Sequence, residues 1–92
     1  MKYRSRTDIV AMILESARTG ATKTKIMYKA YLSYAQVMEY LRVLQENDLL
    51  TYEKGTQLYR VTEKGFKLLR ISHELNDLAV ATNTKSLIKA SS

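Results

Sequence analysis

The sequence predicts a mainly α domain of the α+β class, in which three helices precede a two-stranded hairpin and a long final helix. Three observations support this order of elements. Apolar residues recur at helical spacing in the first half of the chain, alternate with polar residues after Asn47, and return to helical spacing after Thr62. The second and third helices are short and separated by about three residues, as in a winged helix-turn-helix.

The first two helices are predicted over residues 5–18 and 22–30. Ser5 and Asp8 have the spacing of a capping box, in which each side chain bonds the backbone N–H of the other residue. Gly20 follows the first helix, as glycine commonly does just past a helix end. The apolar residues of both helices are expected to face one core.

A third helix is predicted to begin at Ser33, although no proline interrupts the stretch KIMYKAYLSYAQVMEYLRVL. Ser33 and Gln36 fit a second capping box. Beyond them Val37, Leu41 and Leu44 repeat at i, i+4 and i+7, which is the apolar stripe of a helix. The break makes this segment a helix-turn-helix, in which the usual turn glycine is missing.

A hairpin is predicted after the third helix, because the apolar period becomes two. Leu50 and Tyr52 lie on one side of the first strand, and Tyr59 and Val61 lie on one side of the second. The turn between them is expected at Lys54-Gly55-Thr56, with the glycine at a positive φ.

The final helix carries more apolar surface than a small domain needs. Thr62 is expected to cap it, and Phe66 and Leu69 are expected to close the core. A further apolar stripe repeats with spacings of 3, 4, 3 and 4, the pattern of a coiled-coil seam. The alternative is that this stripe folds onto its own domain. The predicted dimer interface consists of Leu68, Ile71, Leu75, Leu78 and Thr82.

The composition is that of a small globular protein. A length of 92 residues allows one domain, and 46% hydrophobic residues are too many for a disordered chain. The absence of cysteine excludes disulfides and thiolate metal sites. No apolar run reaches the roughly 18 residues of a membrane span, and the N-terminus lacks a signal-peptide core. We therefore expect an intracellular protein with no membrane partner.

The net charge of +6 is concentrated in the first third of the chain. Residues 1–34 carry seven basic and two acidic groups, a net of +5, whereas residues 35–61 have a net of −1. A domain with such a basic half favours a polyanionic partner. Charge alone is equally compatible with a role in solubility.

Seven tyrosines raise the hypothesis of base stacking, because aromatic rings among basic groups can hold single strands. The spacing favours a structural role for most of them. Three are expected on core-facing positions, and three are expected to pack around the helix-turn-helix turn in place of the missing glycine. The first set is Tyr40, Tyr52 and Tyr59, and the second is Tyr28, Tyr31 and Tyr34.

The stretches RSRTDI, TKTKIMYKAYLSY and YRVTEKG resemble an archaeal family of winged-helix DNA-binding proteins, the ten-kilodalton Sulfolobus chromatin type. The resemblance covers roughly residues 3 to 78. It implies a homodimer joined by an antiparallel coiled coil of C-terminal helices, and it implies binding to duplex DNA.

The second helix of a helix-turn-helix enters the major groove with its N-terminal residues. We therefore expect contacts from the start of the third helix, from basic residues of the arm and second helix, and from the wing. The alternatives are a solvated charged face for the lysines and a purely capping role for Gln36, while Glu39 and Glu46 would repel phosphate. The predicted DNA-binding residues are Arg4, Arg6, Lys23, Lys25, Lys29, Ser33, Tyr34, Gln36, Arg42, Lys54 and Gln57.

An enzyme is not expected. The single histidine, His73, has Glu74 beside it rather than one helical turn away, and the chain has neither cysteine nor a phosphate-binding glycine loop. We predict no catalytic residues, no metal site, no cofactor and no small-molecule ligand.

The predicted function is sequence-tolerant or moderately specific binding of double-stranded DNA by a homodimer, nucleoid-associated within the cytoplasm. The role would be that of a transcription regulator or of an architectural chromatin-type protein. Residues 1–62 would form the winged helix-turn-helix domain with its basic arm, and residues 63–92 would close the core and then dimerise. The alternative is a winged helix used as a protein–protein interaction module without DNA contact.

Overall fold

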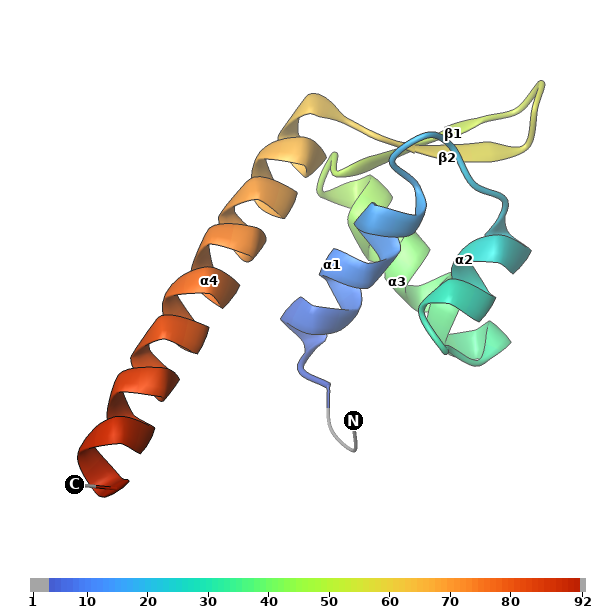
Figure 1. Cartoon of the computed structure of the whole chain (residues 1–92). Helices are drawn as coiled ribbons and strands as arrows, with labels where there is room; N and C mark the ends of the chain where they lie inside the picture. Colours follow the sequence, from blue (N-terminus) through green and yellow to red (C-terminus); the bar gives the residue numbers. More distant parts are fainter. Residues whose placement is uncertain (1–3, 92) are drawn as a thin grey trace.

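The computed structural model describes the backbone of residues 4–91 and the side chains of residues 4–78. Its elements follow the predicted order (Figure 1). Helix α1 lies between α2 and α4, and the hairpin lies across one end of the helices. The elements are α1 (Arg6–Ser16), α2 (Lys23–Lys29), α3 (Tyr34–Glu46), β1 (Leu50–Glu53), β2 (Leu58–Val61) and α4 (Glu63–Ser91).

Each helix begins directly after a hydroxyl residue that caps it. The Ser5 hydroxyl accepts from the Asp8 N–H at 3.0 Å, and the Asp8 carboxylate accepts from the Ser5 N–H at 3.0 Å. Thr22 caps α2, and Thr62 caps α4 by accepting from the Gly65 N–H at 3.0 Å. These hydroxyls satisfy backbone donors that a helix start leaves without partners. The predicted caps of α1 and α4 are thus confirmed.

The turn between α2 and α3 closes without glycine. Tyr31 takes a left-handed φ of 54°. The Leu32 N–H donates to the Met27 carbonyl at 3.0 Å, and the Tyr31 N–H donates to the Tyr28 carbonyl at 3.3 Å. This pair of bonds is a Schellman motif, which ends α2. Leu32 is then buried, and Ser33 starts α3 through the predicted capping box.

The core lies between the first three helices, the hairpin and the first turns of α4. Its α3 contribution is the predicted stripe, and Leu69 from α4 is buried as predicted. The fully buried large side chains are Ile13, Leu14, Ile26, Val37, Leu41, Leu44 and Leu50.

The hairpin is antiparallel, with Leu50 opposite Val61 and Tyr52 opposite Tyr59. A short bridge adds Ala21 beside Tyr59, with N–H to carbonyl distances of 3.0 and 2.8 Å. The bridge places the residues just before α2 against the second strand of the wing.

Four expectations about side chains or turns are wrong, and one of them is that Tyr52 faces the core, since its side chain is exposed. The positive φ of the hairpin loop is at Gln57, which takes 59°, and not at Gly55. The loop comprises residues 54–57, and the residue with the left-handed backbone, Gln57, is the last of them. Phe66 is exposed rather than in the core.

The tyrosines at the helix-turn-helix turn are also exposed, contrary to expectation. Arg4 from the N-terminal arm closes the turn instead: its guanidinium donates to the Ala30 carbonyl and, at 3.0 Å, to the Tyr31 carbonyl. Because main-chain bonds and this arginine stabilise the turn, the rings are not needed to pack it.

Gly65 sets the distance between α4 and the end of the hairpin. A Cβ at this position would lie 2.4 Å from the Leu49 carbonyl oxygen and 2.6 Å from a Val61 methyl carbon. The helix can approach so closely only because this residue lacks a side chain. The face of α4 that follows Gly65 packs on α1, where Leu69 and Ser72 are buried.

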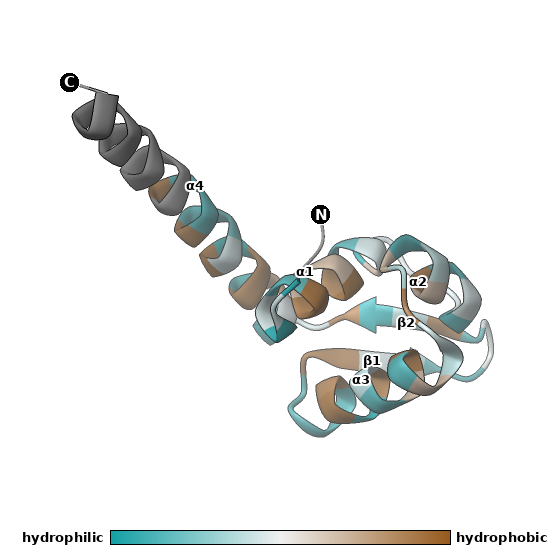
Figure 2. Ribbon diagram, turned by 90° about the horizontal axis from the view of Figure 1, so that it is seen from below, coloured by the Kyte–Doolittle hydropathy of each residue, from teal (hydrophilic) through white to brown (hydrophobic). Residues whose placement is uncertain are grey.

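Beyond its first turns, α4 extends away from the other elements and carries apolar residues along its described part (Figure 2). None of the helices in the described residues is both long and apolar enough to cross a membrane.

Candidate nucleic-acid interface

The first residues of α2 and α3 meet at the surface. The Lys23 ammonium lies 4.9 Å from the centre of the Tyr34 ring, and it donates a hydrogen bond of 3.3 Å to the Tyr34 hydroxyl. A cation over an aromatic ring is attracted by the negative ring face. Lys23 is therefore held beside the end of α3 that a helix-turn-helix presents to DNA.

The wing continues this surface. The rings of Tyr52 and Tyr59 lie 4.8 Å apart, centre to centre, and are tilted by 47°. Burial raises the pKa of the Tyr59 hydroxyl, an effect that nearby Lys23 opposes and that Tyr52 and Tyr34 reinforce. The bridge between Ala21 and Tyr59 brings the chain just before Lys23 against the wing, so the Lys23–Tyr34 pair and the Tyr52–Tyr59 pair are neighbours. We call Lys23, Tyr34, Tyr52 and Tyr59 the α3–wing surface.

Ser33 and Gln36 lie exposed at the start of α3 beside this surface. The Gln36 side-chain carbonyl accepts from the Ser33 N–H at 2.9 Å, and the Ser33 hydroxyl accepts from the Gln36 N–H at 3.2 Å. The cap therefore uses the oxygen of the Gln36 amide, while its NH₂ group is a separate donor that a base or phosphate could accept from.

The far half of the outer face of α3 is acidic. Arg42 binds Glu46, at 2.7 Å between nitrogen and oxygen, and it also binds Glu39 one turn earlier. The hydrogen bond with Arg42 lowers the pKa of Glu39 below its usual range, and the two carboxylates raise the pKa of the guanidinium. All three side chains are exposed, and the cluster has a net charge of −1. A phosphate approaching there meets more negative than positive charge.

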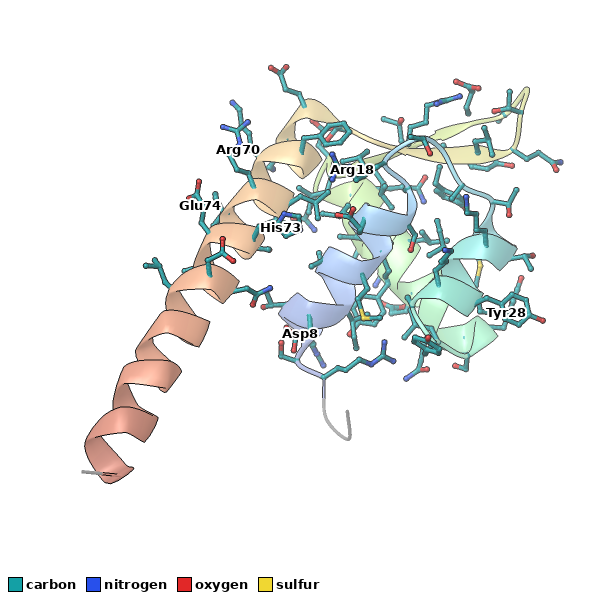
Figure 3. The ribbon with its side chains drawn as sticks, viewed as in Figure 1. Asp8, Arg18, Tyr28, Arg70, His73 and Glu74 are labelled. Atoms are coloured by element: carbon teal, nitrogen blue, oxygen red, sulfur yellow. The ribbon has the colours of Figure 1, made fainter. Side chains whose placement is uncertain are left out.

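Lys25 and Lys29 lie on a different side of α2 from Lys23. They line an open groove of about 700 Å³ along α1, whose walls include Asp8 and Glu15. In Figure 3 the side chain of His73 points from α4 toward α1, whereas those of Arg70 and Glu74 point away from it. The His73 imidazole lies 3.6 Å from the Glu15 carboxylate. Lys25 and Lys29 therefore lie on the α1 side of α2, whereas Lys23 lies on the side that faces Tyr34.

The two arginines of the N-terminal arm are placed apart. Arg4 is half-buried and is bound to the carbonyls of the helix-turn-helix turn. Arg6 is exposed and borders a small pocket of about 340 Å³ beside Glu39 and Tyr40.

The wing tip carries the remaining predicted contacts. Lys54 and Gln57 are both exposed there. Glu53 accepts hydrogen bonds from Thr56 and, at 3.2 Å, from Arg60, and these bonds lower the pKa of its carboxyl group. The tip therefore offers one lysine beside an internally paired carboxylate.

The stripe on α4 stands largely in solvent. Leu68 is half-buried against the core, whereas Ile71, Leu75 and Leu78 are 50, 57 and 65% exposed. The side chain of Thr82, the last residue of the predicted interface, lies outside the described residues.

The participation of Tyr52 and Tyr59 in the α3–wing surface was not predicted from the sequence. Their alternation placed them on the core side of the hairpin, but the hairpin extends past the core and leaves Tyr52 exposed. The pairing of Arg42 with Glu39 and Glu46 could have been predicted from the sequence, because glutamates three residues before and four after an arginine on a helix can both pair with it.

Among the described residues, no group of three or more His, Cys, Asp or Glu side chains is arranged to hold a metal ion.

Comparison with known proteins gives the chain a fold and a family. Residues 3–80 match the family described as winged helix-turn-helix. The structure is similar to that of Sso10a-2, a DNA-binding protein from Sulfolobus solfataricus, with a TM-score of 0.76 and 24% identity over 92% of this chain and 96% of that one.

A second similar structure is that of ZitR from Lactococcus lactis in complex with DNA. Its TM-score is 0.63, and the identity is 22% over 90% of this chain and 62% of ZitR. No match was found among curated protein sequences.

Proposed function

Because the chain belongs to the winged helix-turn-helix family, we propose that it binds double-stranded DNA as a homodimer. The start of α3 would enter the major groove, and the wing would lie along the neighbouring backbone. The contact between Lys23 and Tyr34 carries this proposal, since it presents a cation and hydrogen-bonding groups together where α3 begins.

Charge and fold both support this assignment. No acidic residue occurs between Glu15 and Glu39, a stretch that includes all of α2, the turn and the start of α3. Sso10a-2 is a DNA-binding protein, and ZitR has been seen with DNA, which supports the same use of this fold here.

Within this interface the predicted residues take different roles. Lys23, with Lys54 at the wing, would neutralise phosphates, and Ser33, Tyr34, Gln36 and Gln57 would make polar contacts. Arg4 would act indirectly, by fixing the turn that aims α3. The other basic residues lie away from this interface, and a duplex would reach them only if it also covered the groove along α1 or the pocket beside Glu39. These residues are Lys25 and Lys29 in the groove and Arg6 at the pocket.

The dimer would form through α4. A fully withdrawn Leu or Ile side chain contributes roughly 1.5–3 kcal/mol, and Ile71, Leu75 and Leu78 are at least half exposed in the single chain. An apolar stripe of this kind on a projecting helix favours burial against a second copy. Residues 1–62 would then be the DNA-binding unit and residues 63–92 the dimerisation unit, in antiparallel pairing.

A dimer would hold two copies of α3 at a fixed separation, so that it grips one duplex twice or bridges two. The first arrangement suits a transcription regulator, and the second suits an architectural chromatin-type protein.

A second candidate function is a protein–protein interaction module. The net negative cluster of Glu39, Arg42 and Glu46 on α3 favours it, because a basic partner would be attracted there. A titration of a random-sequence duplex at several salt concentrations separates the two functions. Duplex binding that weakens steeply with salt is expected of a phosphate-binding protein, and no binding at low salt would favour the interaction module.

A further inference from the structure

Three tyrosine rings at the turn between α2 and α3 face solvent. Tyr28, Tyr31 and Tyr34 are 71, 78 and 59% exposed, and Tyr28 points outward from α2 in Figure 3. A buried tyrosine ring contributes strongly to a core or an interface. These exposed rings, at the end of α2, in the turn and at the start of α3, are available to a ligand with flat aromatic faces.

The conformation of Tyr31 supports a functional origin for this arrangement. Its φ of 54° is one that glycine adopts without steric cost and that other residues avoid. Arg4 holds this backbone through the carbonyls of Ala30 and Tyr31. The chain thus keeps an aromatic residue where a glycine would fold more easily, and such local strain gathers at functional sites.

One positive charge is placed against these rings, the ammonium group of Lys23. The other basic residues between Glu15 and Glu39 lie elsewhere: Arg18 pairs with Glu15 at 3.3 Å, and Lys25 and Lys29 line the groove along α1. Lys23 contacts Tyr34 directly. Aromatic rings with a cation beside them are the combination that holds a nucleic acid strand by its bases and its backbone.

We propose that Tyr28, Tyr31 and Tyr34, together with Lys23, form a binding surface for unpaired bases of single-stranded DNA. In a duplex the base faces are stacked on one another, and only their edges are open to a protein. Unpaired bases expose their faces and stack on tyrosine with little sequence preference. The single-strand surface and the proposed duplex interface share Lys23 and Tyr34, and the inference rests on the proposed function to that extent. Tyr28 and Tyr31 lie outside the α3–wing surface.

The test is a double variant, Tyr28→Ala with Tyr31→Gly. Alanine suits the exposed position in α2, and glycine suits the left-handed backbone at position 31. Anisotropy at low salt would be measured with a labelled oligothymidylate of about 20 nucleotides and with a duplex of equal length. We expect the variant to lose about tenfold or more in affinity for the single strand and less than about twofold for the duplex.

The matched control is Tyr28→Phe with Tyr31→Phe, which keeps the ring faces and should keep single-strand affinity. Stacking should also quench the tyrosine fluorescence of the unaltered protein, which tests the proposal without any substitution. Any of these results would overturn it: no binding of the unaltered protein to oligothymidylate, binding without quenching, an unchanged single-strand affinity in the Ala/Gly variant, or a loss in the Phe variant. Equal losses on single strand and duplex would assign the rings to the duplex interface and also overturn it. Duplex binding, measured on the same proteins, tests the proposed function separately.

Discussion

The Lys23 ammonium lies 4.9 Å from the centre of the Tyr34 ring and donates to its hydroxyl at 3.3 Å, so the first residues of α2 and α3 face each other. The cation–π contact at such an exposed site is worth about 0.5–1 kcal/mol. It directs one positive charge of α2 toward the groove-facing end of α3.

Replacing Lys23 by alanine should weaken binding to every duplex alike. One lost phosphate contact reduces the slope of log K against log salt by about one unit. Lys67→Ala is the matched control, since Lys67 is an exposed lysine on α4 and should leave the slope unchanged. The double variant Lys25→Ala/Lys29→Ala should reduce the slope by about two units only if the duplex also covers the groove along α1. A Lys23→Ala protein with the unaltered slope would remove Lys23 from the interface.

Freeing Arg42 should strengthen duplex binding. Glu39→Gln combined with Glu46→Gln removes two negative charges from α3 and releases the guanidinium from its partners. We expect tighter binding and a steeper salt dependence, by about one unit of slope if Arg42 reaches a phosphate. Glu74→Gln with Asp77→Asn makes the same charge change on α4. Equal gains in both variants would mean that net charge, rather than Arg42, is responsible.

Gly65→Ala should destabilise the fold. The new Cβ would lie 2.4 Å from the Leu49 carbonyl oxygen, so α4 would have to move away from the hairpin. Overpacking of this kind costs typically about 1–3 kcal/mol. Gly55→Ala is the control, since nothing lies within 4 Å of a Cβ there. Thermal or urea unfolding measures both, and similar midpoints for the two variants would contradict the close approach of α4.

Replacing Leu75 and Leu78 by glutamate should give a monomer and reduce duplex affinity by more than the added charge explains. The reason is that these side chains, 57 and 65% exposed in the single chain, would lie between two copies of α4. Leu75→Gln with Leu78→Gln makes the stripe polar without adding charge and should dissociate the dimer as well. Analytical ultracentrifugation decides the matter, and an unaltered protein that is monomeric at tens of micromolar would refute the dimer.

Much of the fold could be predicted because its signals are local. Ser5, Ser33 and Thr62 each start a helix through a side chain that bonds backbone only three residues away, so the spacing in the sequence was sufficient. The change of period after α3 likewise predicted the hairpin. The resemblance to a winged-helix family is confirmed by the family match over residues 3–80.

The features that could not be predicted depend on contacts between distant segments. Arg4 reaches Tyr31 across 27 positions, and no pattern near the turn indicates that an arginine of the arm will close it. Phe66 is exposed because α4 packs through the face of Gly65 and Leu69. The α3–wing surface likewise depends on the bridge between Ala21 and Tyr59, which joins two segments that share no local signal.

The most direct test of the DNA interface is a map of backbone amide chemical shifts as a random-sequence duplex is added to the unaltered protein. We predict the largest changes at residues 22–25, at residues 33–36 and along the wing at residues 52–59. Changes confined to the groove along α1 and to α4, with the start of α3 unaffected, would contradict this prediction.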